Sequence, residues 1–162
     1  MLLMNRGAIW LAVLTMAASV HAEDRVVTVA DYQATLKAYE ELKPLAKKVL
    51  TLSRLLALKA ETIPEETDPV YMGKSTRALQ ESFEKLILDA APLGDTSFVE
   101  PFGRCGVLPK MAQNYATSLL TNDHSSQTYD NLYQQTYRDC KAAINNKPID
   151  KTGLAILDLG DN

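Results

Sequence analysis

The two cysteines, Cys105 and Cys140, have the clearest potential for chemistry in this 162-residue chain. Redox-active dithiols usually lie close together as C-x-x-C, with one thiolate exposed near a helix N-terminus. Here the cysteines are far apart in sequence, and Cys140 falls on an apolar stripe. We therefore predict a structural disulfide, which would stabilise the fold by about 4 kcal/mol if its effect is lost chain entropy in the unfolded state.

Residue patterns for catalysis and metal binding are scarce. The chain has two histidines, His21 near the start and His124 in a polar turn. A zinc site usually needs three or four ligands from Cys, His and acids, and the haem-attachment motif C-x-x-C-H is missing. Nucleophile-elbow, phosphate-loop and dinucleotide-binding motifs are missing as well. We predict no catalytic residue, no metal site and no cofactor, although the 20 acidic residues leave a carboxylate pair open as acid and base.

Tyrosines form a regular ladder in the second half of the chain. Tyr129, Tyr133 and Tyr137 recur at every fourth position, so they share one face of a helix. With Tyr115 they could line a ligand cavity, or they could form the edge of an apolar core with hydroxyls that reach water. We favour the core edge and keep Tyr129 and Tyr133 as candidate binding residues.

Two phenylalanines lie in the segment 95–103, DTSFVEPFG, between two predicted helices. Phe98 and Phe102 could form an exposed wedge that contacts a partner. They could also close one end of a helical bundle, which is the commoner use of such residues. Phe98 and Phe102 are therefore candidate binding residues with a structural alternative.

These residues need two antiparallel helices to position them. Apolar residues with helical period predict helices near 107–121 and 126–145, joined by a polar turn. A hairpin folded about residues 123–124 brings Cys105 and Cys140 to its open end, because similar numbers of residues separate each cysteine from the turn. The lengths of the two helices and the sequence setting of the cysteines therefore both predict a Cys105–Cys140 disulfide.

Two residues are predicted to begin the helices of this hairpin. Pro109 suits the first turn of a helix, where a missing N–H costs nothing. Ser125 suits an N-cap, where its hydroxyl would accept from an otherwise unpaired backbone N–H.

Two further helices precede the hairpin. Apolar residues recur every three or four positions over 30–62 and 70–91. Pro44 lacks the N–H that a helix interior requires, so we expect the first helix to be kinked there. Asp68 and Pro69 resemble the N-cap and the first residue of the second helix.

Residues 1–22 have the organisation of a secretory signal peptide. Arg6 supplies a positive start, and the apolar stretch 7–18 is too short to span a bilayer comfortably. Small residues precede position 23, so we expect cleavage after Ala22. An exported chain with two cysteines fits an oxidising space such as the bacterial periplasm, where disulfides persist.

The remainder, 23–162, is predicted to be one mildly acidic domain. It carries 16 basic and 20 acidic residues, for a net charge of −4. No basic excess is available to neutralise phosphates, so nucleic acid is not an expected partner. No segment approaches the ~20 apolar residues of a transmembrane helix, so we expect no membrane anchor. Residues 147–162 form a tail whose apolar cluster, 154–159, either docks on the bundle or is offered to a partner, and we expect docking.

Together these patterns predict a small all-α fold, a bundle of about four main helices with the first one kinked at Pro44 and one disulfide. The function we expect is that of an exported, non-catalytic binding protein of inhibitor, immunity or adaptor type, whose partner is another protein. The alternative is a helical bundle that carries a small ligand or cofactor between its helices.

Overall fold

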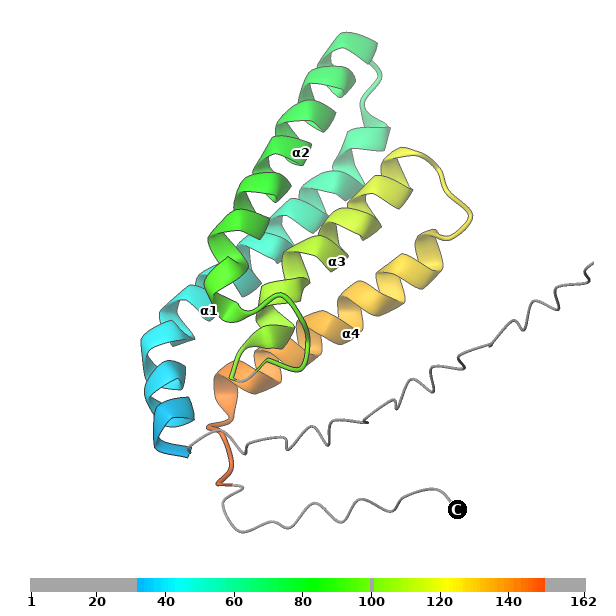
Figure 1. The fold of residues 1–162 in the computed structure, drawn as a ribbon. Coiled ribbons are helices and arrows are strands. Elements are labelled where there is room, and N and C mark those ends of the chain that lie inside the picture. Colours follow the sequence, from blue (N-terminus) through cyan, green and yellow to red (C-terminus); the bar gives the residue numbers. More distant parts are fainter. Residues whose placement is uncertain (1–31, 100, 151–162) are drawn as a thin grey trace, which may run out of the picture.

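The computed structural model describes residues 32–99 and 101–150, which form a bundle of four α-helices (Figure 1). The helices are α1 (Tyr32–Thr62), α2 (Pro69–Ala90), α3 (Gly103–Leu120) and α4 (Ser126–Asn145), with short 3-10 turns η1 (Ile63–Glu65) and η2 (Ala91–Leu93) after α1 and α2. These two ranges contain no strand, so the predicted all-α bundle is confirmed. The predicted signal peptide and the tail from residue 151 onward lie outside the described residues.

Helix α3 lies at the centre of the bundle. It packs against α1, α2 and α4, whereas α2 and α4 do not touch each other within the described ranges. Figure 1 shows α2 and α4 on either side of α3, and the loop after α2 folding back over the end where α3 begins and α4 ends. Helix α3 therefore carries most of the packing, and its first turn is the meeting point of the other segments.

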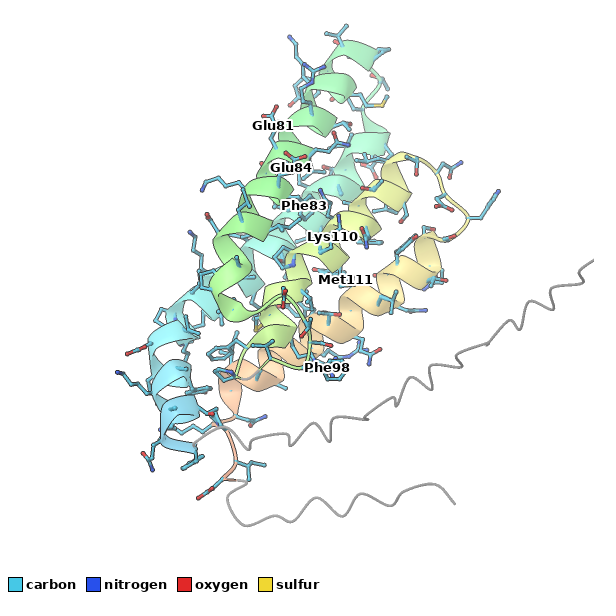
Figure 2. All side chains as sticks on the ribbon, viewed as in Figure 1. Glu81, Phe83, Glu84, Phe98, Lys110 and Met111 are labelled. Atoms are coloured by element: carbon cyan, nitrogen blue, oxygen red, sulfur yellow. A yellow bond between two sulfur atoms is a disulfide. The ribbon has the colours of Figure 1, made fainter. Side chains whose placement is uncertain are left out.

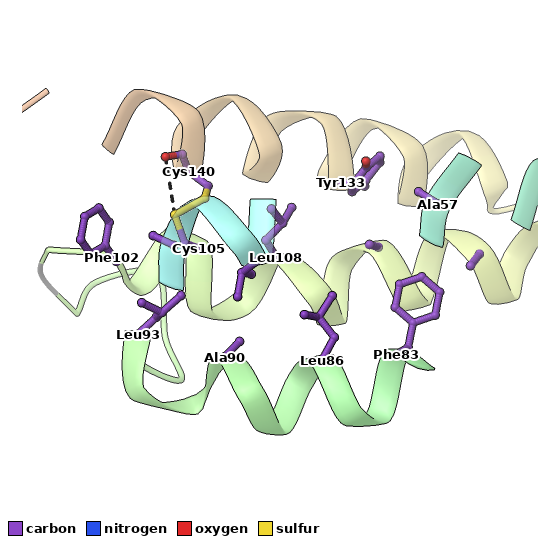
Figure 3. Packing of buried hydrophobic residues seen from close by; sticks show 14 of the residues in the cluster. Ala57, Phe83, Leu86, Ala90, Leu93, Phe102, Cys105, Leu108, Tyr133 and Cys140 are labelled. Carbon is purple, nitrogen blue, oxygen red and sulfur yellow. Dashed lines mark hydrogen bonds between the residues drawn. A yellow bond between two sulfur atoms is a disulfide. The ribbon is translucent and has the colours of Figure 1, made fainter. Parts of the chain in front are cut away.

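Each helix buries one apolar stripe. In α2, Leu79, Phe83 and Leu86 are buried, whereas the neighbouring Glu81 and Glu84 are exposed (Figure 2). Figure 3 shows the buried side chains of α2 facing α3. The larger members of the shared core are Tyr39, Val49, Ile63, Leu79, Phe83, Leu86, Leu93, Phe102, Leu108, Tyr133 and Ile144.

Helix α1 continues through Pro44. Proline has no N–H to donate to the carbonyl of Glu40, and its ring crowds the preceding turn. Figure 1 shows the first turns of α1 running at an angle to the rest of the helix, so the predicted kink is confirmed.

Helix α3 begins at Gly103, one turn earlier than predicted. The carbonyl of Phe102 accepts from the N–H groups of Cys105 at 2.8 Å and Gly106 at 3.0 Å, which builds the additional turn. Pro109 is consequently buried inside the helix, and the prediction that it occupies the first turn was wrong. Packing of the preceding loop, not the proline, determines where α3 begins.

The two predicted N-caps differ in outcome. The carboxylate of Asp68 accepts from the N–H groups of Val70 at 2.9 Å and Tyr71 at 3.4 Å, so this cap is confirmed. Ser125 occupies the N-cap position of α4, but its hydroxyl makes no capping hydrogen bond. The carboxylate of Asp123 instead accepts from the N–H of Ser125 at 2.8 Å, so the nearby acid organises this turn.

Candidate binding groove

The four candidate binding residues lie in different settings. Phe98 is 86% exposed, whereas Phe102 is fully buried. Tyr133 is 4% exposed, and Tyr129 is partly exposed at the start of α4. Among these four, Phe98 is the aromatic side chain that presents most of its ring to solvent (Figure 2).

Phe102 does not reach the surface, which corrects its assignment as a binding residue. Its ring lies under the loop beside the disulfide (Figure 3) and stacks on Tyr39 with ring centroids 5.1 Å apart. It closes the end of the bundle, which is the structural alternative stated for it above. Of the phenylalanine pair, only Phe98 can contact a partner without rearrangement of the core.

Phe98 borders a groove of about 430 Å³ at the end of the bundle where α3 begins. The loop after η2, the first turn of α3 and the chain that follows α4 form its walls. Ile149 is 77% exposed and Val99 is also exposed, so the groove has three accessible apolar side chains. Its other prominent lining residues are Pro101, Arg104 and Lys147.

The loop that carries Phe98 lies directly on α3. A Cβ atom at Gly103 would collide with the carbonyl oxygen of Thr96, and one at Gly106 would collide with the carbonyl group of Gly94. Gly94 itself has a φ of +107°, which residues with a side chain rarely adopt. Three glycines therefore allow a backbone-to-backbone approach that fixes the position of the loop.

Backbone hydrogen bonds also connect described residues of this loop to each other and to the start of α3. The N–H of Val99 donates to the carbonyl of Thr96 at 3.3 Å, and the N–H of Gly103 donates to the carbonyl of Val99 at 2.6 Å. Phe98 is thus the third residue of a hydrogen-bonded turn, Thr96–Val99. Binding through an ordered segment costs less conformational entropy than binding through a segment that must first become ordered.

Tyr39 lies at the base of the groove and joins three elements. Its hydroxyl donates to the carbonyl of Ile144 at 2.7 Å, and the ammonium of Lys43 donates to that hydroxyl at 2.8 Å. The carbonyl of Ile144 belongs to the last turn of α4, and Pro148 has no N–H to donate to it. Tyr39 therefore satisfies a buried acceptor that the chain's own helix cannot satisfy.

Two exposed ion pairs border the groove. Arg104 Nη1 lies 3.5 Å from Asp139 Oδ2 and joins α3 to α4. Lys147 Nζ lies 3.2 Å from Glu40 Oε1 and joins the chain after α4 to α1. Exposed pairs of this kind contribute about 0–1 kcal/mol to stability. Both cations have further N–H donors, so they can bind an additional carboxylate.

The disulfide fixes α3 to α4 next to the groove. Cys105 and Cys140 are 35 residues apart, are bonded to each other and have Cα atoms 4.7 Å apart, which confirms the predicted crosslink. The Cys105 sulfur also lies 3.5 Å from the carbonyl oxygen of Cys140 (dashed in Figure 3). This is a close contact and not a hydrogen bond, because a disulfide sulfur has no proton to donate. Arg104 and Asp139 are the sequence neighbours of the cysteines, so the crosslink also positions this ion pair.

Tyr133 packs between α3 and α4, away from the groove. Its ring stacks on Tyr115 with centroids 5.6 Å apart and lies tilted against Tyr137 at 6.2 Å. Burial raises the pKa of Tyr133 and of Tyr115 to about 12. For Tyr115, the carboxylate of Glu61, which accepts from its hydroxyl at 3.2 Å, contributes to this rise in pKa after burial. The stacked rings fill the space between them, as expected for a core edge.

Tyr129 belongs to neither the groove nor the stack. It borders a polar surface hollow of about 410 Å³ between the end of α3 and the start of α4. The other side chains there include Lys110, Gln113, Asn114, Thr117 and Asp123. The structure therefore does not bring Tyr129 and Phe98 into one site.

Membrane-spanning helices and metal-binding clusters are absent from residues 32–99 and 101–150. No helix in these ranges is both long and apolar enough to cross a membrane, and no cluster of three or more His, Cys, Asp or Glu side chains could hold a metal ion. Comparison with known proteins gives no match to a protein family, a curated protein or a solved structure. The groove is accordingly interpreted from its own geometry.

Sequence reasoning missed two features of the groove. One is the glycine contact: Gly103 and Gly106 are one helical turn apart and follow Gly94, a spacing that signals close backbone approach. The other is Ile149, an isolated apolar residue after Pro148. Its role depends on the fold, because the hairpin brings residue 149 beside residue 98.

Proposed function

We propose that this chain is an exported, non-catalytic binding protein that acts through protein–protein contacts, as an inhibitor, immunity protein or adaptor does. The observation that supports this most strongly is Phe98, which is 86% exposed on a loop held against α3 by glycine contacts. Together with Val99 and Ile149 it forms an apolar surface bordered by cations. Apolar surfaces with a polar rim are typical of protein contacts, and aromatic anchors carry much of their binding energy.

Export is part of this proposal. A buried disulfide fits an oxidising compartment, and residues 1–22 have the features of a signal peptide. We expect the protein from its own source to begin at Glu23 and to weigh two hydrogens less than the reduced chain, as measured by intact mass spectrometry. Free thiols or an intact N-terminal segment would contradict the proposed route. A co-purifying small molecule would favour the ligand-carrier alternative.

Photo-crosslinking from position 98 tests the binding role. A photoreactive phenylalanine analogue replaces Phe98 in the full chain, and crosslinked proteins from the source cells are identified by mass spectrometry. The matched control carries the same analogue at Tyr71, which is 58% exposed in the first turn of α2, whereas the groove loop follows the last turn of that helix. We expect a discrete partner from position 98 and none from position 71.

The affinity of that partner then decides whether Phe98 is an anchor. Phe98→Ser should weaken binding about 30-fold or more, since aromatic hot spots contribute about 2 kcal/mol or more. Tyr71→Ser should leave the dissociation constant unchanged, and both variants should keep the wild-type melting temperature. Equal affinity of the two variants, or equal crosslinking at the two positions, would overturn the proposal.

A further inference from the structure

The chain leaves the bundle at the groove itself. Lys147, Pro148 and Ile149 follow the end of α4 and line the groove wall opposite Phe98. The segment from residue 151 onward, which lies outside the described residues, therefore starts at the rim of an exposed apolar surface. Any apolar part of that segment is close to the groove by connectivity alone.

We propose that residues 154–159 of this chain occupy the groove and cover Phe98. This stretch reads LAILDL and lies between Gly153 and Gly160. It supplies the apolar side chains that the groove lacks on its open side, where Phe98 and Ile149 face solvent. Burying such surfaces against each other is favourable by about 25 cal/mol per Å² of apolar area.

The tether has a suitable length. Five residues lead from Ile149 to Leu154, and an extended chain spans at most ~3.3–3.6 Å per residue, so Leu154 reaches roughly 16 Å from the groove wall. A short tether of this kind gives an effective concentration in the millimolar range. Contacts too weak to hold a free peptide are then sufficient to hold the segment.

Hydrogen-bond donors at the rim of the groove are compatible with the same occupant. The groove is bordered by the cations Arg104 and Lys147, whose side chains remain solvent-exposed in their ion pairs. The segment carries Asp158 within residues 154–159 and Asp161 two residues after Leu159. Each carboxylate can accept from the free N–H donors of a rim cation once the apolar side chains are in place.

Occupancy of the groove by residues 154–159 regulates access to Phe98, a consequence that rests on the proposed function. A partner that uses Phe98 as its anchor must displace the segment. If the segment fills the groove nine-tenths of the time, removing it lowers the partner's apparent dissociation constant about tenfold.

Photo-crosslinking in the isolated protein tests the docking without any partner. The purified full chain carries the photoreactive phenylalanine analogue at position 98, is irradiated at low micromolar concentration, and its products are mapped by mass spectrometry. We expect an intramolecular crosslink to residues 154–159 at the mass of one chain, with none from the analogue at position 71. A second variant, Ile156→Asp with Leu157→Asp, should lose the crosslink at least tenfold while keeping the wild-type melting temperature.

The outcomes separate the docking from the binding role. No crosslink to residues 154–159, or crosslinks only at the mass of two chains, overturns the docking even if Phe98→Ser still weakens a partner. A crosslink to 154–159 combined with unchanged partner affinity in Phe98→Ser supports the docking and overturns the proposed function. A crosslink that persists in the double aspartate variant overturns the docking, because apolar contacts of Ile156 and Leu157 would then not hold the segment in the groove.

Discussion

The two ends of the bundle are built in different ways. At the groove end, loop residues 94–99 lie on α3 through glycine contacts, the disulfide joins α3 to α4, and Tyr39 connects α1 to the last turn of α4. At the other end, the turn 121–125 between α3 and α4 is exposed and held by local hydrogen bonds around Asp123. One end is crosslinked through long-range contacts, and the other is a simple polar turn.

This difference bears on the binding surface that we propose at the groove. An exposed aromatic side chain is an effective anchor only if its backbone is already ordered, because ordering it at the moment of binding reduces affinity. The groove end meets that condition at Phe98, whereas His124, at the polar turn, is supported only locally. Substitutions that weaken one end and spare the other test the comparison directly.

The largest effect is expected at Phe102. Phe102→Ala removes a fully buried ring that packs on Tyr39 and should lower the free energy of unfolding by about 3–5 kcal/mol. Phe98→Ala, four residues earlier in the same loop, should change it by about 0.5 kcal/mol or less, because that ring lies outside the core of the four helices. Urea unfolding followed by circular dichroism measures both. Similar losses in the two variants would show that Phe98 is packed in solution.

Removal of the disulfide should have the next largest effect. Cys105→Ala combined with Cys140→Ala should lower the free energy of unfolding by up to about 4 kcal/mol, since the crosslink closes a loop of 35 residues. The same loss should appear when the wild-type protein is unfolded in the presence of a reductant. If the double variant is as stable as the oxidised protein, the groove end owes its stability to packing alone.

Tyr39→Phe tests the hydrogen bond at the base of the groove. The variant keeps the ring and its stacking on Phe102 but leaves the carbonyl of Ile144 without its donor. A buried acceptor left unpaired costs about 1–3 kcal/mol, so a loss of this size is expected in urea unfolding. Lys43→Met, which removes the partly buried donor to the Tyr39 hydroxyl, should cost clearly less. Equal losses would show that the Tyr39 hydroxyl stabilises the fold through its hydrogen bond with Lys43 and not through its hydrogen bond to the end of α4.

Much of this architecture follows from the sequence because helical periodicity and cysteine placement are local or nearly local signals. The four helices, the kink at Pro44, the cap at Asp68 and the Cys105–Cys140 bond were all predicted correctly. The disulfide could be predicted because the two cysteines are separated from the turn by similar numbers of residues, which correspond to similar lengths of helix in a hairpin.

The burial of Phe102 and the exposure of Phe98 could not be predicted in the same way. Both lie in an irregular segment, where no period assigns one side chain to the core and the other to solvent. The choice depends on how the loop packs on Gly103 and Gly106, a tertiary contact. The early start of α3 has the same origin: the loop supplies packing that overrides the usual preference of Pro109 for a first turn.

High pH should loosen the half of the bundle nearer the polar turn. The folded state holds the protons of Tyr115 and Tyr133 with a pKa of about 12, against 10.0 for an ordinary tyrosine. Their contribution to stability is therefore complete below about pH 10 and is lost as the pH rises towards 12. Tyr133→Phe removes one of these groups and should make the decline in the free energy of unfolding shallower. Absorbance at 295 nm should show one late-titrating tyrosine fewer in the variant than in the wild-type protein.

The smallest effect is expected at the polar turn itself. Asp123→Ala removes the carboxylate that accepts from the N–H of Ser125, which should cost about 0.5–1 kcal/mol, as for loss of an exposed cap. His124→Ala, at the next and exposed position, serves as the control and should have no measurable effect on urea unfolding. A loss above about 2 kcal/mol for Asp123→Ala would exceed what one exposed cap supplies. It would mean that this end also depends on long-range contacts, and the contrast between the two ends would then no longer account for the position of Phe98.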